Sequence, residues 1–225
     1  MILCIETSTA ICSVALASGT KLIALGESSN ANDHASRLLN HIDTCLNEGQ
    51  IKLVDLQAIA VSLGPGSFTG LRVGIAAAKG ISFALGTPLI GINTLEALIW
   101  KAQKTGSGRR YFCAMIKARK DEVYTMISDR EGNITLAPGV VELYNGWHQE
   151  LLAGSNDVLF CGDGIHRYQE LCQSNSLKSV DIKTSSVNLI HLAQRKHIKK
   201  DYSEGKTFGP SYIKRPHITQ ARKVL

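Results

Sequence analysis

The stretch GPGSFTGLRVG, residues 64–74, places four glycines between an apolar run and a segment rich in small residues. Residues 58–62 are apolar and partly β-branched, which predicts a buried strand, and residues 71–85 have helical character. The glycines therefore lie at a turn from a strand into a helix. A turn of this kind predicts that the chain alternates strands and helices around it.

Such a turn can bind an anion. Gly64 and Gly66 allow positive φ and a close backbone approach, and Ser67 or Thr69 can cap the helix, whose dipole adds positive potential. The stretch has neither the Gly-Lys-Ser/Thr of a P-loop nor the glycine spacing of the dinucleotide fingerprint. Two interpretations stay open, a tight structural turn and a phosphate cradle.

The composition is that of a globular protein with one large or two small domains: 225 residues, of which 44% are hydrophobic. Apolar runs are broken before the roughly 20 residues that span a bilayer, and the first 30 residues lack the pattern of a signal peptide. We therefore expect a soluble, cytoplasmic protein without membrane contact. The six cysteines form no C-x-x-C pair, so we expect buried thiols rather than zinc ligands or a disulfide framework.

The positive charge is concentrated at the end of the chain. Residues 183–225 hold ten Lys or Arg against Asp201 and Glu204, an excess of +8, so a net charge of +6 leaves −2 for the preceding residues. A basic segment can bind RNA or another polyanion, or it can be a solvated helix face and tail.

The element pattern predicts an α/β layer fold with mixed sheets. Three strand-like runs form an antiparallel meander, and a helix follows from His34 to Gly49, capped by Asn32 or Asp33. We expect a first domain over residues 1–103 and a smaller second one over residues 109–199, with residues 200–225 packing back on the first. The expected strands are 2–5, 11–17, 21–27, 58–62, 89–92, 111–116, 122–128, 140–143 and 158–161; later helices are 94–103, one near Trp147, one near Tyr168 and 187–199.

Several short motifs resemble the TsaB family in order and spacing. They are residues 6–9 (ETST), His34 followed by Leu38-Leu39, GPGSFTGLRVG, residues 95–98 (LEAL), Ala118-Arg119, residues 122–124 (EVY), residues 162–164 (GDG) and residues 210–212 (PSY). The resemblance covers nearly the full chain, and its most specific element is the glycine-rich stretch.

This resemblance implies two related α/β domains of the actin, sugar-kinase and Hsp70-like fold group. It also implies a cytoplasmic partnership with the paralogue TsaD and the ATPase TsaE, which together install threonylcarbamoyl on N6 of the adenosine beside the anticodon in tRNAs that read ANN codons. In that group TsaD carries the metal and the TsaB member is noncatalytic and holds TsaD through helices. Contact with tRNA would be indirect or through the basic C-terminal part.

The residues give a separate argument for a noncatalytic role. The catalytic paralogues bind a metal through an H-x-x-x-H pair on a helix, but here Leu38 stands four residues after His34, and His41 lies about two turns away. Kinase chemistry in this fold group needs a carboxylate at each phosphate loop; Glu6 is one candidate, and it can equally brace the hairpin. Residues 64–74 contain no acid. A phosphotransferase and a metal-dependent peptidase are the alternative functions, and the peptidase lacks H-E-x-x-H.

A third possibility is that the protein binds a nucleotide without hydrolysing it, in which case ATP or ADP would be bound in the complex. The phosphate-facing candidates are Thr7, Ser8, Thr9, Gly64, Gly66, Ser67, Thr69 and Gly70. Lys117 departs from the acid that the family usually has there, and Arg119 is a candidate contact for RNA or a partner.

Small residues recur along the helix after the glycine turn, at Gly70, Gly74 and Ala78 and, one face around, at Ala76 and Gly80. That spacing lets another helix approach closely. We expect this helix and the one from His34 to dock on TsaD, or on a second copy when TsaD is absent, and we expect a bulky charge at position 78 to abolish docking while the fold is largely kept. The predicted interface residues are Leu38, Leu39, Ile42, Leu46, Gly74, Ile75, Ala78 and Phe83.

Overall fold

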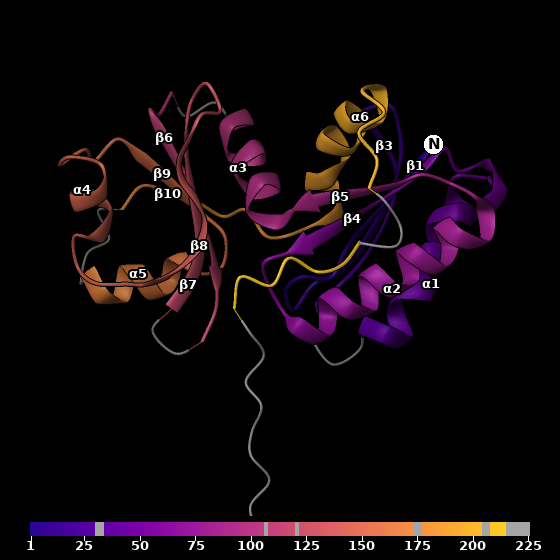
Figure 1. Cartoon of the computed structure of the whole chain (residues 1–225), viewed down its shortest axis with the longest axis horizontal. Helices are drawn as coiled ribbons and strands as arrows, with labels where there is room; N and C mark the ends of the chain where they lie inside the picture. Colours follow the sequence, from indigo (N-terminus) through magenta and orange to yellow (C-terminus); the bar gives the residue numbers. More distant parts are fainter. Residues whose placement is uncertain (30–33, 106–107, 120–121, 173–176, 204–207, 215–225) are drawn as a thin grey trace, which may run out of the picture.

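The protein consists of two five-stranded mixed sheets with helices on both faces of each sheet (Figure 1). This computed structural model describes residues 1–29, 34–105, 108–119, 122–172, 177–203 and 208–214. The predicted fold class, α/β with mixed sheets, is confirmed.

The first sheet has the strand order β3-β2-β1-β4-β5. Its first three strands form the predicted antiparallel meander because short turns join them, whereas β4 and β5 are parallel to β1 because helices connect them. The bounds are β1 Ile2–Glu6, β2 Cys12–Ser18, β3 Lys21–Ser28, β4 Ala58–Gly64 and β5 Leu89–Asn93.

The second sheet repeats this topology with the order β8-β7-β6-β9-β10, again a meander followed by parallel strands. The strand expected over residues 140–143 begins earlier, at Ile134, because it continues the pairing with β7. Neither β10 nor the 3-10 turn η1 (Leu53–Asp55) was predicted from the sequence. The bounds are β6 Tyr111–Lys117, β7 Glu122–Asp129, β8 Ile134–Glu142, β9 Val158–Cys161 and β10 Ser179–Val180.

Each face of each sheet has its own helices and its own apolar core. Helices α1 (His34–Glu48) and α2 (Phe68–Leu85) cover one face of the first sheet. On its other face lie η2 (Ser186–Leu189) and α6 (Ile190–Ile198). Helix α3 (Thr94–Lys104) is wedged between the two sheets, so Ala97 packs on the first and Leu98 on the second. The remaining face of the second sheet carries α4 (Trp147–Leu151) and α5 (Ile165–Cys172).

Local chemistry fixes several helix ends. Ser67 caps α2 by accepting a hydrogen bond from the N–H of Gly70 at 3.2 Å, as one of the two predicted caps, and α2 ends at Gly86, which has φ +64°. Asn93 caps α3 by accepting from the N–H of Leu95 and Glu96. The caps expected at residues 32 and 33 lie outside the described residues.

The chain returns to the first sheet at η2, before the end of the expected second domain at residue 199. Residues of η2 and α6 pack on the first sheet although the sequence placed them in residues 109–199. Beyond them, Ser203 N–H donates to the carbonyl of Leu89 and Ser211 N–H to that of Leu63. The domain division stays a proposal, and this packing favours ending the second unit before Ser186.

Helix α2 is longer and more apolar than expected from the sequence, in which we expected apolar runs too short to span a bilayer. With 18 residues and an apolar composition, it is long enough by these two measures alone to cross a bilayer, and a core helix of a water-soluble protein meets the same measures. Its Leu71, Ile75 and Ala78 side is buried on the first sheet.

Candidate functional site

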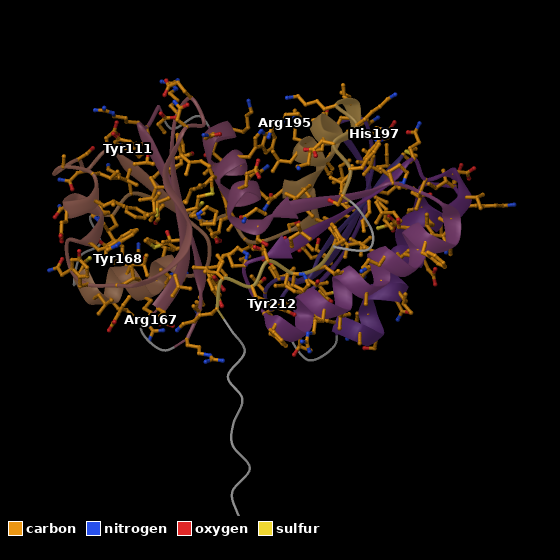
Figure 2. All side chains as sticks on the ribbon, in the orientation of Figure 1. Tyr111, Arg167, Tyr168, Arg195, His197 and Tyr212 are labelled. Carbon is orange, nitrogen blue, oxygen red and sulfur yellow. The ribbon has the colours of Figure 1, made fainter. Side chains whose placement is uncertain are left out.

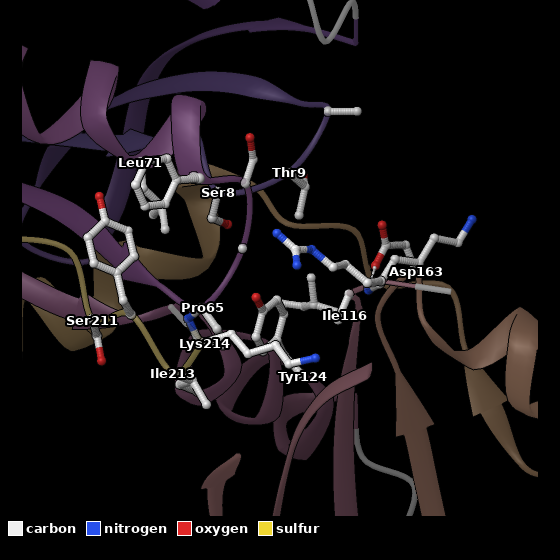
Figure 3. A pocket seen from close by; sticks show the side chains of 18 of the residues that line it. Ser8, Thr9, Pro65, Leu71, Ile116, Tyr124, Asp163, Ser211, Ile213 and Lys214 are labelled. Atoms are coloured by element: carbon white, nitrogen blue, oxygen red, sulfur yellow. Dashed lines mark hydrogen bonds between the residues drawn. The ribbon is translucent and has the colours of Figure 1, made fainter. Parts of the chain in front are cut away.

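A cavity of about 600 Å³ opens between the two sheets, where the predicted phosphate loops meet the second sheet (Figure 3). One wall is formed by the turn after β1 and by the turn into α2. The opposite wall comes from the end of β6 with the two residues that follow it and from Asp163 in the turn after β9, and residues 211–214 close one side. The side chains used below are Ser8, Thr9, Pro65, Phe68, Lys117, Arg119, Asp163, Tyr212 and Lys214.

Three glycines of the turn and of α2 pack directly against the first hairpin, which is the turn between β1 and β2. A Cβ on Gly66 would lie 2.0 Å from the carbonyl oxygen of Ser8, one on Gly70 2.1 Å from that of Thr7, and one on Gly74 2.2 Å from Thr7 Oγ1. Residues 66, 70 and 74 are spaced by four, so they face the hairpin in one row. The glycines are therefore required by a close approach of the protein to itself.

Direct hydrogen bonds join the two candidate phosphate loops. The N–H of Ser67 donates to the carbonyl of Ser8 at 2.6 Å, and Thr7 Oγ1 donates to the carbonyl of Gly70 at 2.8 Å. At these distances no group can lie between the bonded atoms. A phosphate could reach only the outer side of this pair of loops, where Thr9 and Phe68 line the cavity.

Glu6 is buried behind the hairpin. Its Oε1 accepts hydrogen bonds from the N–H of Ser8 and from Ser62 Oγ, both at 2.7 Å. Burial raises the pKa of Glu6, and the hydrogen bonds from Ser8 and Ser62 oppose that rise. The predicted bracing role is confirmed, and Glu6 is not among the cavity-lining residues.

The wall from the second sheet is cationic. Lys117 and Arg119 line the cavity and are exposed, and neither has an ion pair within the described part of the chain. Among the described lining residues Asp163 is the one acid, and its Oδ1 accepts a hydrogen bond from the backbone N–H of Lys117 at 2.9 Å. Gly162 (φ +92°) lets this turn pack on β6, since a Cβ there would lie 2.2 Å from the carbonyl of Met115.

The histidines on α1 have structural hydrogen bonds. His34 Nε2 lies 2.9 Å from the carbonyl oxygen of Thr9, and His41 Nε2 lies 3.1 Å from Ser28 Oγ. Across the residues that the structure describes, no three His, Cys, Asp or Glu side chains gather closely enough to hold a metal. His34 thus fixes the first hairpin to α1.

Residues 208–214, the C-terminal strap, connect the two sheets across the cavity. Tyr212 stacks on Phe68 with ring centroids 4.6 Å apart and accepts a hydrogen bond from Arg72 Nε at 3.0 Å. Further on, Lys214 forms an ion pair with Glu122 of β7. Sequence reasoning noted Pro210-Ser211-Tyr212 as a motif but missed this role, which no local pattern signals because the contacts span more than 90 residues.

Most of the predicted interface residues are buried in the protein's own core, which corrects the prediction for them. They face the first sheet because the apolar stripe of a helix on a sheet turns inward. The expected outcome for a charge at Ala78 is therefore wrong: that side chain has no exposed surface, so the substitution would damage the fold. The buried residues are Leu38, Ile42, Leu46, Gly74, Ile75 and Ala78, whereas Leu39 is 59% and Phe83 is 92% exposed.

The outward side of α2 carries Ala76, Gly80 and Phe83, all of them exposed. A Cβ on Gly80 would meet nothing within 4 Å. Glycine within a helix costs about 1 kcal/mol relative to alanine, and here no contact with a described residue requires it. Gly80 and Phe83, three residues apart, thus lie on the same exposed side of α2.

Comparisons with known proteins agree over most of the chain. The family model described as TsaD, tRNA N6-adenosine threonylcarbamoyltransferase, matches residues 28–217. The tRNA threonylcarbamoyladenosine biosynthesis protein TsaB of Escherichia coli (strain K12) is 36% identical over 185 residues, which cover 78% of this chain and 77% of that protein.

Two solved structures support the fold. YeaZ from Pseudomonas aeruginosa superposes with a TM-score of 0.78 at 27% identity, covering 94% of this chain and 98% of that one. Component A of (R)-2-hydroxyglutaryl-CoA dehydratase from Acidaminococcus fermentans superposes with a TM-score of 0.52 at 9% identity, covering 89% and 98%. The chain therefore has the actin, sugar-kinase and Hsp70-like fold that its motifs implied.

Proposed function

The chain belongs to the TsaB family, as its motifs predicted, and from that premise we propose that it acts in the biosynthesis of threonylcarbamoyladenosine in tRNA. Its part is that of a noncatalytic subunit. It binds TsaD through α2 and α1, and the resulting assembly, with TsaE, transfers threonylcarbamoyl to the adenosine beside the anticodon.

One observation carries this proposal: the outward side of α2 combines an open glycine with a large apolar side chain left in solvent. Within the part of the chain that the structure describes, Gly80 has no neighbour that requires a glycine, and Phe83 is 92% exposed. Leu39 on α1 adds a second exposed apolar side chain. Small residues that admit a close helix, next to a bulky apolar anchor, are what helix-to-helix docking needs.

The noncatalytic part of the proposal is supported by the contacts between the two phosphate loops. The N–H of Ser67, at the start of α2, is already bonded to Ser8, and Glu6 is occupied in bracing the hairpin. A backbone N–H that could bind phosphate and a carboxylate that could bind magnesium in an enzyme of this fold thus make internal hydrogen bonds here. This favours a scaffold over the alternative, an ATP-dependent phosphotransferase.

Copurification with TsaD tests the docking surface. Gly80→Arg places a long charged side chain on the outward side of α2, and open space at Gly80 means that the free chain should still fold. Val54→Arg is the matched control, because Val54 is 71% exposed and lies in η1, outside both helices. We expect wild type and Val54→Arg to copurify with TsaD and Gly80→Arg to lose it.

Unchanged copurification of Gly80→Arg would refute the docking surface. Loss of a self-associated dimer of the free chain in the same variant would show that two copies use this surface when TsaD is absent. The activator role is tested by reconstitution with TsaD and TsaE, scoring modified tRNA with and without this chain. Full modification without it would overturn the role.

A further inference from the structure

The face of the first sheet opposite α1 and α2 is strongly basic. It is formed by α3, α6 and the two residues that follow α6, and we call it the α3–α6 face. Arg195 lies on the side of α6 that faces α3, and His197 lies on the side of α6 that faces away from α3 (Figure 2). Its acidic residues are Glu96 and, just beyond, Asp201; its lysines and arginines are Lys101, Lys104, Arg195, Lys196, Lys199 and Lys200.

Both acids are already paired with one cation each. Arg195 bonds Glu96 at 3.3 Å and Lys196 bonds Asp201 at 2.8 Å. The four remaining lysines, at 101, 104, 199 and 200, have no ion pair within the described ranges of the chain, which leaves a net charge of +4. Such an excess of unpaired charge on two neighbouring helices is typical of a surface that meets a polyanion.

An aromatic pair lies among these charges. Trp100 of α3 stacks on His191 of α6 with ring centroids 4.4 Å apart, and Lys104 Nζ lies 5.8 Å from the centre of the Trp100 ring. His191 is exposed and Trp100 is half-buried. Exposed aromatic rings beside cations are the combination that RNA-binding surfaces use, because phosphates bind the cations and bases stack on the rings.

The two helical faces of the first sheet therefore differ in kind. Helices α1 and α2 together have a net charge of +1, from Arg37, Arg72, Lys79, Asp43 and Glu48. Their face also carries the exposed apolar side chains of Leu39 and Phe83. Helices α1 and α2 lie on one side of the sheet and α6 on the other (Figure 1). A protein partner on α2 would leave the α3–α6 face accessible.

We infer that the α3–α6 face binds the phosphate backbone of the tRNA that the assembly modifies. The identity of the polyanion as tRNA rests on the proposed function. The contact is electrostatic, so it positions the RNA and carries no sequence specificity. One subunit would in this way hold the protein partner on one side of a sheet and the RNA on the other.

The test measures binding of fluorescein-labelled, unmodified tRNA by anisotropy over a salt series, with the chain alone and with its TsaD complex. The variant is Lys104→Glu with Lys199→Glu. The matched control is Lys21→Glu with Lys52→Glu, which makes the same change in net charge at exposed lysines of β3 and of the loop after α1. We expect the variant to bind about tenfold more weakly and its salt slope to fall by about two, one per lost phosphate contact, and the control to bind like wild type.

Equal losses in the variant and the control would overturn the inference, because net charge alone would then explain binding. Absence of tRNA binding by wild type, both alone and with TsaD, would also overturn it. So would a variant that binds tRNA normally but loses TsaD or TsaE, since the face would then contact an acidic protein. Copurification with TsaD separates the two proposals: Gly80→Arg tests docking, and the lysine variant should keep TsaD.

Discussion

The two halves of α2 use glycine for opposite purposes. In the N-terminal half, Gly70 and Gly74 allow the hairpin after β1 to approach so closely that a Cβ would lie within 2.2 Å of Thr7. In the C-terminal half, Gly80 faces open space. The difference teaches that a run of small residues on one helix can serve the protein's own packing at one end and leave a docking surface at the other.

The largest expected effect is at the packed end. Gly70→Ala would drive a Cβ to 2.1 Å from the carbonyl oxygen of Thr7, and a backbone atom cannot move aside cheaply. We expect the free energy of unfolding to fall by about 3 kcal/mol, which is the upper end of the usual cost of overpacking a protein core. Urea denaturation measures it, and a loss below about 1 kcal/mol would mean that the hairpin is not held by these glycines.

Thr7→Val tests the same contact between the hairpin and α2 with a smaller expected loss of stability. The substitution keeps the shape of the side chain and removes the hydroxyl that donates to the carbonyl of Gly70 at 2.8 Å. We expect a loss of about 1 kcal/mol, the usual worth of one buried hydrogen bond. A variant as stable as wild type in the same denaturation assay would show that the Thr7 hydroxyl does not help to join the two loops, which would then be held by the Ser67–Ser8 hydrogen bond and by steric fit.

In the C-terminal half of α2, where Gly80 faces open space, replacing glycine by alanine should raise the free energy of unfolding instead of lowering it. Gly80→Ala adds a methyl group where nothing lies within 4 Å and reduces the freedom of the unfolded chain. We expect the free chain to gain up to about 1 kcal/mol in stability while its affinity for TsaD falls. A destabilised variant would contradict the comparison between the two halves of α2, whereas unchanged affinity would contradict only the docking proposal.

The smallest effect concerns Glu6 behind the hairpin. Burial raises its pKa in the folded state, so the folded protein binds the proton more tightly than the unfolded chain does, and this stability is present at low pH and lost as the pH rises through the folded-state pKa. Glu6→Gln stays neutral throughout. We therefore expect Glu6→Gln to gain stability relative to wild type between pH 4 and pH 7, measured by denaturation at both values. A constant difference would mean that Glu6 does not titrate in this range.

Much of the fold follows from the sequence because its patterns are local. The short strand-like runs of β1–β3 and the helical repeat of α1 predict their elements to within a residue or two. The Ser67 cap and the bracing role of Glu6 were also predicted, since Gly70 and Ser8 lie within three residues of them in the chain. The further bond from Ser62 to Glu6, 56 residues away, was not.

The surfaces could not be predicted in the same way. Leu38 and Leu39 are neighbours of the same type, yet one is in the core and the other is 59% exposed. The strap contact between Tyr212 and Phe68 and the return of α6 to the first sheet depend on segments more than 90 residues apart. Such pairings are set by the packing of the whole chain and leave no local pattern.

By itself the sequence determined the family, the mixed α/β architecture and the placement of a glycine-rich turn before α2, because these depend on residue type, order and spacing. The tertiary structure alone decided what the glycines are for. Gly70 is required by Thr7, which lies 63 residues earlier, and Gly80 is required by no residue that the structure describes. A glycine has no side chain to show its purpose, so only its neighbours in space distinguish internal packing from a surface left open to a partner.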